Sequence, residues 1–429
     1  MVLLLQDAPH GARLAGLRPG MRFPCLAAVV VLAIATNAFG AEIHDAARAG
    51  DVESPPSATV PFVLDHGRLT IEVGLPRPDG AVRLARAWID TGGTALVLAA
   101  PLARELGLDV SALTPGGERA VATTSPAPPV RVGGVALDTA GLAVQVFPAR
   151  VARPGVQAEI TVPARALRHL HVVFDYPARQ ITLATPGAVS PRGTAVPCRV
   201  NADTGLFMID VDIEGQTVAL GVDTGSAGTW VSDTLTKHWA RQHADWHQAA
   251  GAAGSSNFFG FDLETRGMLL RLPVLAVGGV RVSDTAVLGL DQSLFDWYSK
   301  KSAGPVAGFL GGNVLSRFRL EVDFPGQQTY WQAGPDRRID DLDIVGLTLR
   351  AETDGSFTVA DVVSKNGQPT VPGVLPHDTL LRVDALDATG APMGAVIQAL
   401  RGAPGDWRTL VLGRAGQRLT VRARVMRLP

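Results

Sequence analysis

The stretch LGVDTGSAGTWV, Leu220 to Val231, decides the fold because an earlier part of the chain repeats it. An apolar run leads into Asp223, and Thr, Gly and Ser follow. The segment RAWIDTGGTALVLA places the same residue types around Asp90. The two acids are 133 residues apart, and each follows a strand-like apolar run. Two such triplets in matching surroundings indicate one structural unit present twice.

Two further landmarks follow each triplet in the same order. A Val-Gly-Gly turn places its first glycine 43 residues after Asp90 and 55 residues after Asp223. An acid-aromatic-proline turn comes next, in VVFDYP and in EVDFP, with its acid a further 42 and 45 residues along. Matching order and spacing predict two copies of one β unit, over 57–188 and 189–336.

The rest of the chain is typical of a mainly β protein. Short apolar runs alternate with turns rich in Gly (47 residues) and Pro (30 residues). The clearest helix is predicted over 100–108, with a proline near its start and Gly107 near its end. The glycine pairs at 133–134 and 278–279 are expected to be hairpin turns, because no Lys-Ser or Lys-Thr follows them as a phosphate loop requires. A further small β domain is expected over 342–429.

The N-terminal region carries the pattern of a secretory signal peptide. In MRFPCLAAVVVLAIATNAFGAE, a basic start at Met21 and Arg22 precedes a charge-free stretch that ends in small residues. We expect cleavage after Gly40 or Ala41, so 1–41 is the signal, Met21 is a candidate start, and 42–56 is a linker. We therefore expect a periplasmic or secreted protein. An uncleaved inner-membrane anchor is the alternative, since 23–41 is just long enough to span a bilayer.

Charge and cysteine content exclude some classes of function. The net charge of −1 provides no basic excess for a nucleic-acid partner. Cys25 lies in the predicted signal, so the exported chain keeps only Cys198, and no disulfide is expected. The surroundings of Cys198, TAVPCRV, predict a buried strand residue.

Two Asp-Thr-Gly triplets, each after a strand, provide the groups needed for general acid-base catalysis by a pair of carboxyls. Glycine lets the backbone turn sharply beside the carboxylate, and threonine can bond across to the twin loop. Two carboxylates held face to face cannot both ionise easily, so the pair shares one proton. The ionised member can take a proton from water while its partner donates one to a carbonyl oxygen. A third triplet, Asp203-Thr204-Gly205, follows no apolar run and is expected to be an ordinary turn.

The motifs resemble the retropepsin and pepsin superfamily of aspartic proteases, with both lobes on one chain. The resemblance implies two closed β-barrel lobes that form a pseudo-twofold cleft, and catalytic roles for Asp90 and Asp223. GFLGGNVL, Gly308 to Leu315, resembles the family's element that passes behind the catalytic loop, where only Gly311 leaves room. The loop-supporting residues are then Thr91, Gly92, Thr224, Gly225, Ser226 and Gly311. Residues 342–429 are similar to a PDZ domain, with Pro376-His377-Asp378 in place of Pro-Gly-Asp.

The first copy departs from the family pattern in two places. Aligning the acid-aromatic-proline turns puts Pro163 opposite Gly311, which predicts weaker support for the Asp90 loop. Gly93 stands where the second copy has Ser226. We expect the Ser226 hydroxyl to hydrogen-bond Asp223 and favour its ionised form, leaving the proton on Asp90 and a pH optimum nearer neutrality than that of gastric-type relatives.

Other aromatic and histidine clusters have two interpretations each. Phe258, Phe259 and Phe261 fall where the family has its flap, and they are expected either to cover a bound peptide or to pack in the core. His169 and His171 alternate on a strand, and His243 and His247 are four residues apart, beyond His238. Neither set supplies a full zinc motif, so no metal and no cofactor is expected.

The resulting hypothesis is a monomeric exported aspartic endopeptidase that acts on peptides or proteins. Its PDZ-like domain would bind an extended peptide by strand addition. One alternative is a catalytically inactive peptide-binding protein on the same scaffold. A second alternative keeps the chemistry but pairs the second lobe with the same lobe of another chain.

Overall fold

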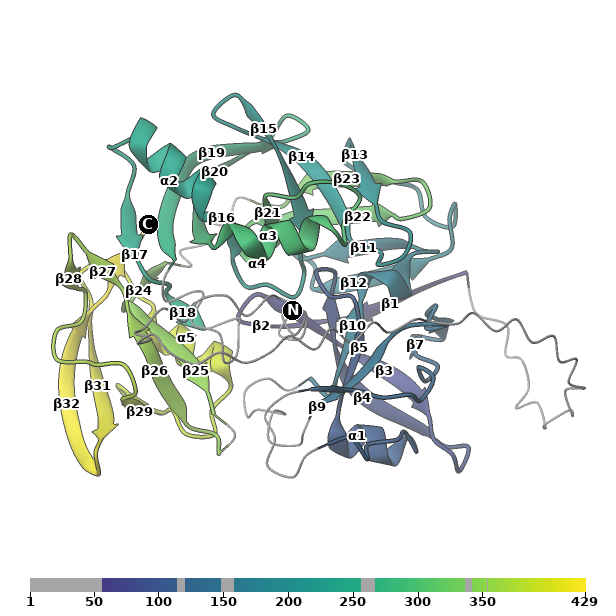
Figure 1. The fold of residues 1–429 in the computed structure, drawn as a ribbon, viewed down its shortest axis with the longest axis horizontal. Helices are drawn as coiled ribbons and strands as arrows, with labels where there is room; N and C mark the ends of the chain where they lie inside the picture. The colour runs from purple at the N-terminus through teal and green to yellow at the C-terminus, as the bar shows by residue number, and fades with distance from the viewer. Residues whose placement is uncertain (1–55, 114–119, 148–157, 256–266, 336–341, 353) are drawn as a thin grey trace, which may run out of the picture.

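The computed structural model describes residues 56–113, 120–147, 158–255, 267–335, 342–352 and 354–429. The predicted signal peptide and Phe258, Phe259 and Phe261 lie outside these ranges. The prediction of a mainly β chain is confirmed, because strands dominate every part (Figure 1). No helix within the described ranges is both long and apolar enough to cross a membrane.

In its described residues, the first copy of the repeat contains twelve strands, one short α-helix and one 3-10 helix. In chain order they are β1 (Ser57–Pro61), β2 (Val63–Asp65), β3 (Arg68–Pro76), β4 (Val82–Asp90), β5 (Leu96–Ala99), α1 (Ala100–Glu105), β6 (Val121–Ala122), β7 (Arg131–Val132), β8 (Val135–Ala136), β9 (Val144–Phe147), β10 (Ile160–Pro163), η3 (Ala164–Leu167), β11 (His171–Asp175) and β12 (Gln180–Ala184).

The second copy and the C-terminal part continue the pattern. The second copy holds β13 (Thr194–Val200), β14 (Phe207–Ile213), β15 (Gln216–Val222), β16 (Thr229–Ser232), α2 (Asp233–Gln242), β17 (Gln248–Ala250), β18 (Gly254–Ser255), β19 (Met268–Val277), β20 (Val280–Leu290), α3 (Gln292–Ser299), β21 (Gly308–Leu310), α4 (Gly312–Leu315), β22 (Phe318–Asp323) and β23 (Gln328–Ala333). The C-terminal part holds β24 (Asp343–Ile344), β25 (Leu347–Ala351), β26 (Phe357–Val362), β27 (Ser364–Lys365), β28 (Gln368–Pro369), β29 (Thr379–Val383), β30 (Leu386–Asp387), α5 (Met393–Leu400), β31 (Trp407–Arg414), β32 (Gln417–Arg424) and β33 (Met426–Arg427).

The two copies share one strand order around their triplets. The first copy runs β9-β5-β10-β4-β3, and the second runs β20-β16-β21-β15-β14. In both, the strand that ends at the triplet pairs in parallel with a later strand of the same copy, β4 with β10 and β15 with β21. The turns that join β7 to β8 and β19 to β20 are the predicted glycine pairs, and all four glycines have positive φ angles, as type I′ hairpin turns require.

A six-stranded sheet joins the two copies. Its order is β1-β12-β11-β22-β23-β13, so the halves meet at β11 and β22. These strands pair antiparallel, with Val173 opposite Glu321 at the middle of the register and His171 opposite Asp323 at one end. Buried apolar residues from both copies form one continuous core beneath these sheets.

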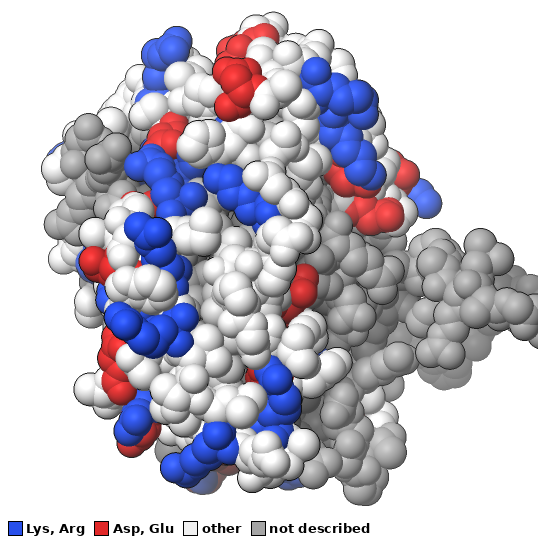
Figure 2. Space-filling model, turned by 90° about the vertical axis from the view of Figure 1, so that its left-hand side faces the viewer, with Lys and Arg blue, Asp and Glu red and all other residues white. Residues whose placement is uncertain are grey.

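The C-terminal part shares a core and two strand pairs with the second copy. Its sheet runs β25-β26-β29-β31-β32, with β30 paired to β29, and begins next to β18, whose Gly254 and Ser255 pair in parallel with β25. β17 pairs with β27. Ala249, Leu269 and Ala286 belong to the same buried cluster as the C-terminal residues. The outer side of this region, which includes β32, carries Lys and Arg side chains interspersed with acidic and uncharged ones (Figure 2).

Candidate active site

The loop after β15 holds Asp223 by its backbone. The Asp223 N–H donates to the carbonyl oxygen of Leu310 on the neighbouring strand β21, at 2.9 Å. Gly225 N–H donates to Asp223 Oδ1 at 2.8 Å. The triplet follows the buried end of β15, Leu220 to Val222, and Asp223 itself is completely buried.

The loop after β4 places Asp90 in an equivalent setting. Asp90 ends β4, and Gly92 N–H donates to Asp90 Oδ1 at 3.1 Å. β10 runs beside this loop, with Pro163 in register with Asp90. The side chain of Asp90 is as buried as that of Asp223.

Two threonines lock the loops together by reciprocal hydrogen bonds. Thr91 Oγ1 donates to the carbonyl oxygen of Val222 at 2.6 Å, and Thr224 Oγ1 donates to that of Ile89 at 2.5 Å. Each hydroxyl also accepts from the backbone N–H of the other threonine, at 3.0 Å and 3.3 Å. Four buried bonds therefore fix one loop against the other, in the arrangement that the duplicated triplets predicted.

The two carboxylates meet across this junction. A Cβ added to Gly92 would lie 2.6 Å from Asp223 Cγ, and one added to Gly225 would lie 2.6 Å from Asp90 Cγ. Each glycine thus packs against the carboxylate of the opposite loop, where no side chain fits. The structure brings Asp90 and Asp223 together, with Thr91, Gly92, Thr224 and Gly225 around them.

Burial and mutual charge perturb this pair. Burial, followed by the negative charge of Asp90, raises the pKa of Asp223 from its ordinary 3.8 to about 8. Burial raises the pKa of Tyr176 as well, and the charge of Asp223 adds to that rise. Tyr298 behaves in the same way, with contributions from both acids. The two tyrosines are neighbours of the site that sequence reasoning missed. Tyr176 belongs to the repeated acid-aromatic-proline turn, which is the one available signal.

The expected role of Ser226 is wrong. Its hydroxyl donates to the carbonyl oxygen of Gly228 at 2.7 Å instead of to the Asp223 carboxylate. The expectation that Asp223 is the more acidic member loses this support, and burial, followed by the charge of Asp90, raises the pKa of Asp223. Ser226 shapes the loop, since its backbone carbonyl oxygen also accepts from Gly312 N–H at 2.8 Å.

Gly311 passes close behind the Asp223 loop, as the sequence predicted. The first copy has apolar residues at the positions of both Gly311 and its hydrogen-bond partner. A Cβ on Gly311 would lie 2.0 Å from the carbonyl oxygen of Gly228. Gly311 N–H donates to Thr229 Oγ1 at 3.1 Å, and Thr229 in turn donates to Asn313 Oδ1 at 2.7 Å. In the first copy Pro163 has no N–H, and Leu96 stands where Thr229 does and has no hydroxyl. Donor and acceptor are lost together, so no buried group is stranded.

The remaining sequence candidates have structural partners. His171 Nε2 lies 2.7 Å from Glu321 Oε2, and His169 Nε2 lies 3.0 Å from Asp138 Oδ2. α2 ends at Gln242, so His243 and His247 do not share a helix face, and His243 stacks on Trp246.

Two predictions about structural positions are confirmed. Asp203-Thr204-Gly205 forms a turn held by the side chain of Asn201, which accepts from the N–H groups of Asp203 and Thr204 at 3.0 Å each. Cys198 is a buried thiol on β13, and burial raises its pKa to about 12.

Comparisons with known proteins find similarity among solved structures alone. No protein-family model matches this chain, and no curated protein matches it. Among solved structures, the crystal structure of an aspartic proteinase from Irpex lacteus matches with 13% sequence identity and a TM-score of 0.37. That match covers 65% of this chain and 97% of the other.

Proposed function

We propose that this chain is an exported aspartic endopeptidase that uses Asp90 and Asp223 to hydrolyse peptide bonds. The observation that carries the proposal is the reciprocal lock between the two Asp-Thr-Gly loops, which buries two carboxylates against each other. A buried acid pair costs stability, because at least one member must stay protonated. Four hydrogen bonds that hold such a pair in place are hard to account for unless the pair does chemistry.

The chemistry follows from a dyad with one proton. The ionised carboxylate removes a proton from a water molecule, and the resulting hydroxide attacks the amide carbon. The protonated carboxyl donates its proton to the carbonyl oxygen, which gives a neutral tetrahedral diol. The carboxyl that took the proton from water then protonates the amide nitrogen, while the other carboxylate takes a proton from one hydroxyl of the diol. The C–N bond breaks, an amine and a carboxylic acid are released, and the dyad again holds one proton.

We assign the shared proton to Asp223 and the role of base to Asp90. Burial disfavours ionised Asp223 first, and the charge of Asp90 adds to this effect. Gly93 packs closely against Asp90, because a Cβ at that position would lie 3.0 Å from Asp90 Oδ2.

Isosteric substitutions of the two acids test the proposal. We expect Asp90→Asn and Asp223→Asn each to lower kcat by about 100-fold to 10,000-fold on a peptide that the wild type cleaves, as is usual when general acid-base catalysis is lost. A transition-state mimic with a central hydroxyl should inhibit the wild type. If a broad peptide library yields no cleavage by wild-type protein but does yield bound peptides, the inactive peptide-binding protein is the correct alternative.

Monomeric activity is part of the proposal. Both acids come from one chain, and the sheet between the copies is internal to it. Sedimentation of active protein should give the mass of one chain. If activity appears only in a dimer, the pairing of second lobes from two chains replaces this proposal.

We further propose that the C-terminal part is a PDZ-like peptide-binding domain, with β32 as the strand to which peptide adds. β25 already pairs with β18, whereas β32 pairs with β31 alone among the described residues. His377 adopts a φ of +72°, the conformation that the glycine of Pro-Gly-Asp would take, and Asp378 binds Arg414. A cross-linker at Arg422→Cys should capture extended peptides, and one at Arg350→Cys on β25 should not.

A further inference from the structure

The last hairpin of the chain, formed by β31 and β32, concentrates positive charge. Residues 407–424 contain five arginines and no lysine, aspartate or glutamate, although the whole chain has a net charge of −1. Arg408 and Arg414 are held by hydrogen bonds to partners on neighbouring segments. The other three arginines lie on β32 and are exposed: Arg418, Arg422 and Arg424.

The register of the sheet puts these three arginines on one face. Leu419 and Val421 alternate with them along β32 and pack against the buried core of the C-terminal part, so the arginines point away from that core. The neighbouring strands add two exposed side chains to the same face, one from β31 and one from β29. We call this surface the outer sheet face, and its members are Arg382, Trp407, Arg418, Arg422 and Arg424. Figure 2 views the molecule from the side of β32 and shows Lys and Arg side chains spread over it.

The charge of the outer sheet face is not neutralised by the described part of the chain. None of its four arginines forms an ion pair there. Asp387 of β30 stands opposite Arg382 at one border of the face. Other acids near the hairpin have partners, since Asp378 binds Arg414 and Asp384 accepts from a backbone N–H of β31 at 2.7 Å. The face therefore presents net positive charge to solvent.

An exposed tryptophan stands among these arginines. Trp407 is 52% exposed, whereas five of the seven tryptophans of the chain are buried. The guanidinium group of Arg422 lies over its ring, with Cζ 4.8 Å from the ring centroid. The contact keeps an apolar ring at the surface beside positive charge. The outer sheet face thus combines groups that bind anions with a side chain that favours a less polar environment.

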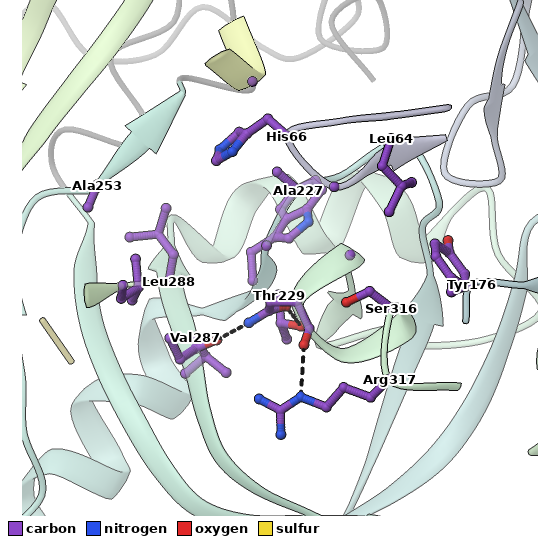
Figure 3. A pocket seen from close by; sticks show the side chains of 18 of the residues that line it. Leu64, His66, Tyr176, Ala227, Thr229, Ala253, Val287, Leu288, Ser316 and Arg317 are labelled. Carbon is purple, nitrogen blue, oxygen red and sulfur yellow. Dashed lines mark hydrogen bonds between the residues drawn. The ribbon is translucent and has the colours of Figure 1, made fainter. Parts of the chain in front are cut away.

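The internal cavity near the Asp223 loop differs from this face. It has a volume of about 520 Å³ and lies where the three parts of the chain meet. Figure 3 shows Leu64 on one side of the space and Leu288 on another. Its arginines, Arg179, Arg317 and Arg401, all interact with other groups of the protein. The arginines of the outer sheet face, in contrast, have no carboxylate partner among the described residues.

A phospholipid surface offers the groups that this face is suited to bind. Phosphate oxygens accept hydrogen bonds from the planar guanidinium group of arginine, frequently two at a time. Each basic side chain close to an anionic bilayer adds to the attraction. Trp407 can enter the boundary between headgroups and acyl chains, where tryptophan rings gather. An acidic protein is less suitable, because a stable protein interface has a cluster of apolar side chains at its centre, and the face has one aromatic side chain among the described residues.

We propose that the outer sheet face binds the surface of a bilayer that contains anionic phospholipid, with its four arginines at the phosphates and Trp407 at the headgroup boundary. The proposal does not depend on proteolysis. It uses the face of β32, whereas strand addition uses the edge of that strand, so a peptide and a bilayer can be bound together. Binding would hold the C-terminal part against the membrane.

Flotation with vesicles tests this surface on the full chain. We expect vesicles with about 30% phosphatidylglycerol to bind about tenfold more tightly than vesicles of phosphatidylcholine alone, and the ratio to fall as salt rises from about 0.05 M to about 0.5 M. The triple variant Arg418→Gln, Arg422→Gln, Arg424→Gln should reduce the ratio to below about threefold. The matched control, Arg104→Gln, Arg241→Gln, Arg281→Gln, removes the same charge from exposed positions elsewhere and should leave the ratio unchanged. Residues 1–41 are common to all variants, so any lipid binding of their own does not affect the comparison.

Fluorescence shows whether Trp407 enters the bilayer. Its emission is obtained as the difference between wild type and Trp407→Phe. We expect this emission to shift to shorter wavelength on phosphatidylglycerol vesicles and to be quenched by lipids with brominated acyl chains, because the ring leaves water for the headgroup boundary.

Several outcomes would overturn the proposal. Equal binding of wild type and the β32 triple variant to phosphatidylglycerol vesicles would show that the arginines play no part. Unchanged Trp407 emission on bound vesicles would place the contact elsewhere. Tighter binding of poly-glutamate or of single-stranded DNA than of vesicles, lost in the same triple variant, would assign the face to an acidic polypeptide or to nucleic acid. If the triple variant fails to fold, salt-independent vesicle binding by the wild type, together with unchanged Trp407 emission, rejects the proposal.

Discussion

Thr91 and Thr224 exchange hydrogen bonds across the two copies, each hydroxyl accepting from the other residue's backbone N–H while it donates to a strand carbonyl oxygen. Both side chains are buried, so water cannot take over these bonds. The opposite copy of the repeat therefore helps to fix each carboxylate, in addition to the bonds that each loop makes within its own copy.

Removing either hydroxyl should weaken the whole junction. Thr224→Val keeps the size of the side chain but leaves the carbonyl oxygen of Ile89 and the N–H of Thr91 without their partner. We expect the free energy of unfolding to fall by about 1–3 kcal/mol, the usual cost of a stranded buried polar group. Urea unfolding measures this change, and the activity of the folded variant should fall with it.

The same experiment on Thr91→Val and on the double variant shows whether the bonds act as one unit. Since they share a network, the double variant should lose less than the sum of the two single variants. Thr420→Val on the exposed face of β32 is the matched control, and a loss there as large as at Thr224 would reject the explanation.

The raised pKa of Asp223 makes stability depend on pH. In the unfolded chain this carboxyl loses its proton near its ordinary pKa of 3.8, whereas the folded protein holds the proton up to about pH 8. The stabilising contribution is complete below about pH 4 and is lost as the pH rises through about 8. We expect Asp223→Asn to lack this decline, so unfolding curves from pH 4 to pH 9 should diverge from wild type. Parallel curves would contradict the assignment.

The activity should also depend on whether Asp223 holds its proton. If Asp223 donates to the substrate carbonyl oxygen, kcat should fall on the alkaline side as Asp223 deprotonates near pH 8. The pH profile of kcat on a cleavable peptide measures this limb. An activity maximum below about pH 3.5, under the ordinary range of a carboxyl pKa, would show that the proton is held elsewhere.

Gly311 and Pro163 occupy equivalent places and should respond differently to alanine. A methyl group on Gly311 would lie 2.0 Å from the carbonyl oxygen of Gly228, so the backbone must move. We expect Gly311→Ala to cost about 1–3 kcal/mol of stability and to lower kcat by about 100-fold through misplacement of Asp223. Pro163→Ala creates no such clash, but it introduces a buried N–H that Leu96, which has no hydroxyl, cannot accept, so we expect a cost of about 1–3 kcal/mol from the stranded donor and a smaller effect on kcat than that of Gly311→Ala. Equal losses of kcat in the two variants would refute this account.

Glu321 should stabilise the sheet between the copies above its own pKa. It is fully buried, which opposes ionisation, but bonds from His171, Arg319 and Arg192 N–H hold its pKa below the ordinary 4.5. Its contribution is present above about pH 4.5 and is lost as the pH falls through the lowered pKa. Glu321→Gln should cost about 2 kcal/mol at pH 7, with the gap closing in acid. Asp210→Asn, at an exposed pair with Arg199, should cost less than about 1 kcal/mol.

The duplicated pattern predicted the meeting of Asp90 and Asp223 and the glycine hairpins, and the resemblance of GFLGGNVL to a known element implied the tight fit of Gly311. These predictions succeeded because each depends on a local requirement, an acid at a strand end or a position without room for Cβ. The partner of the Ser226 hydroxyl was mispredicted, since two acceptors lie within reach and only the backbone path selects the Gly228 carbonyl oxygen.

Relations between distant segments left little trace in the sequence. From the sequence, Leu96 and Pro163 in the first copy indicate a degraded version of Thr229 and Gly311 in the second. The structure shows instead that the N–H donor of Gly311 and its Thr229 acceptor are both absent from the first copy. The pairing of β18 with β25 and the cavity beside it arise from short segments with no periodic pattern. Such contacts depend on how the folded parts of the chain pack against each other, and the spacing of residues does not predict that packing.

The pairing of β11 with β22 has a consequence for how the chain is made. β11 is complete at Asp175, but its partner strand ends at Asp323, so a nascent chain emerging from the ribosome carries an unsatisfied row of backbone amides for almost 150 residues. Such a row is a template for self-association with other nascent chains. If the chain is exported unfolded, folding begins only after the whole chain has crossed the membrane, and β22 is then available to β11 from the start. Export would in that case also protect the protein from aggregation.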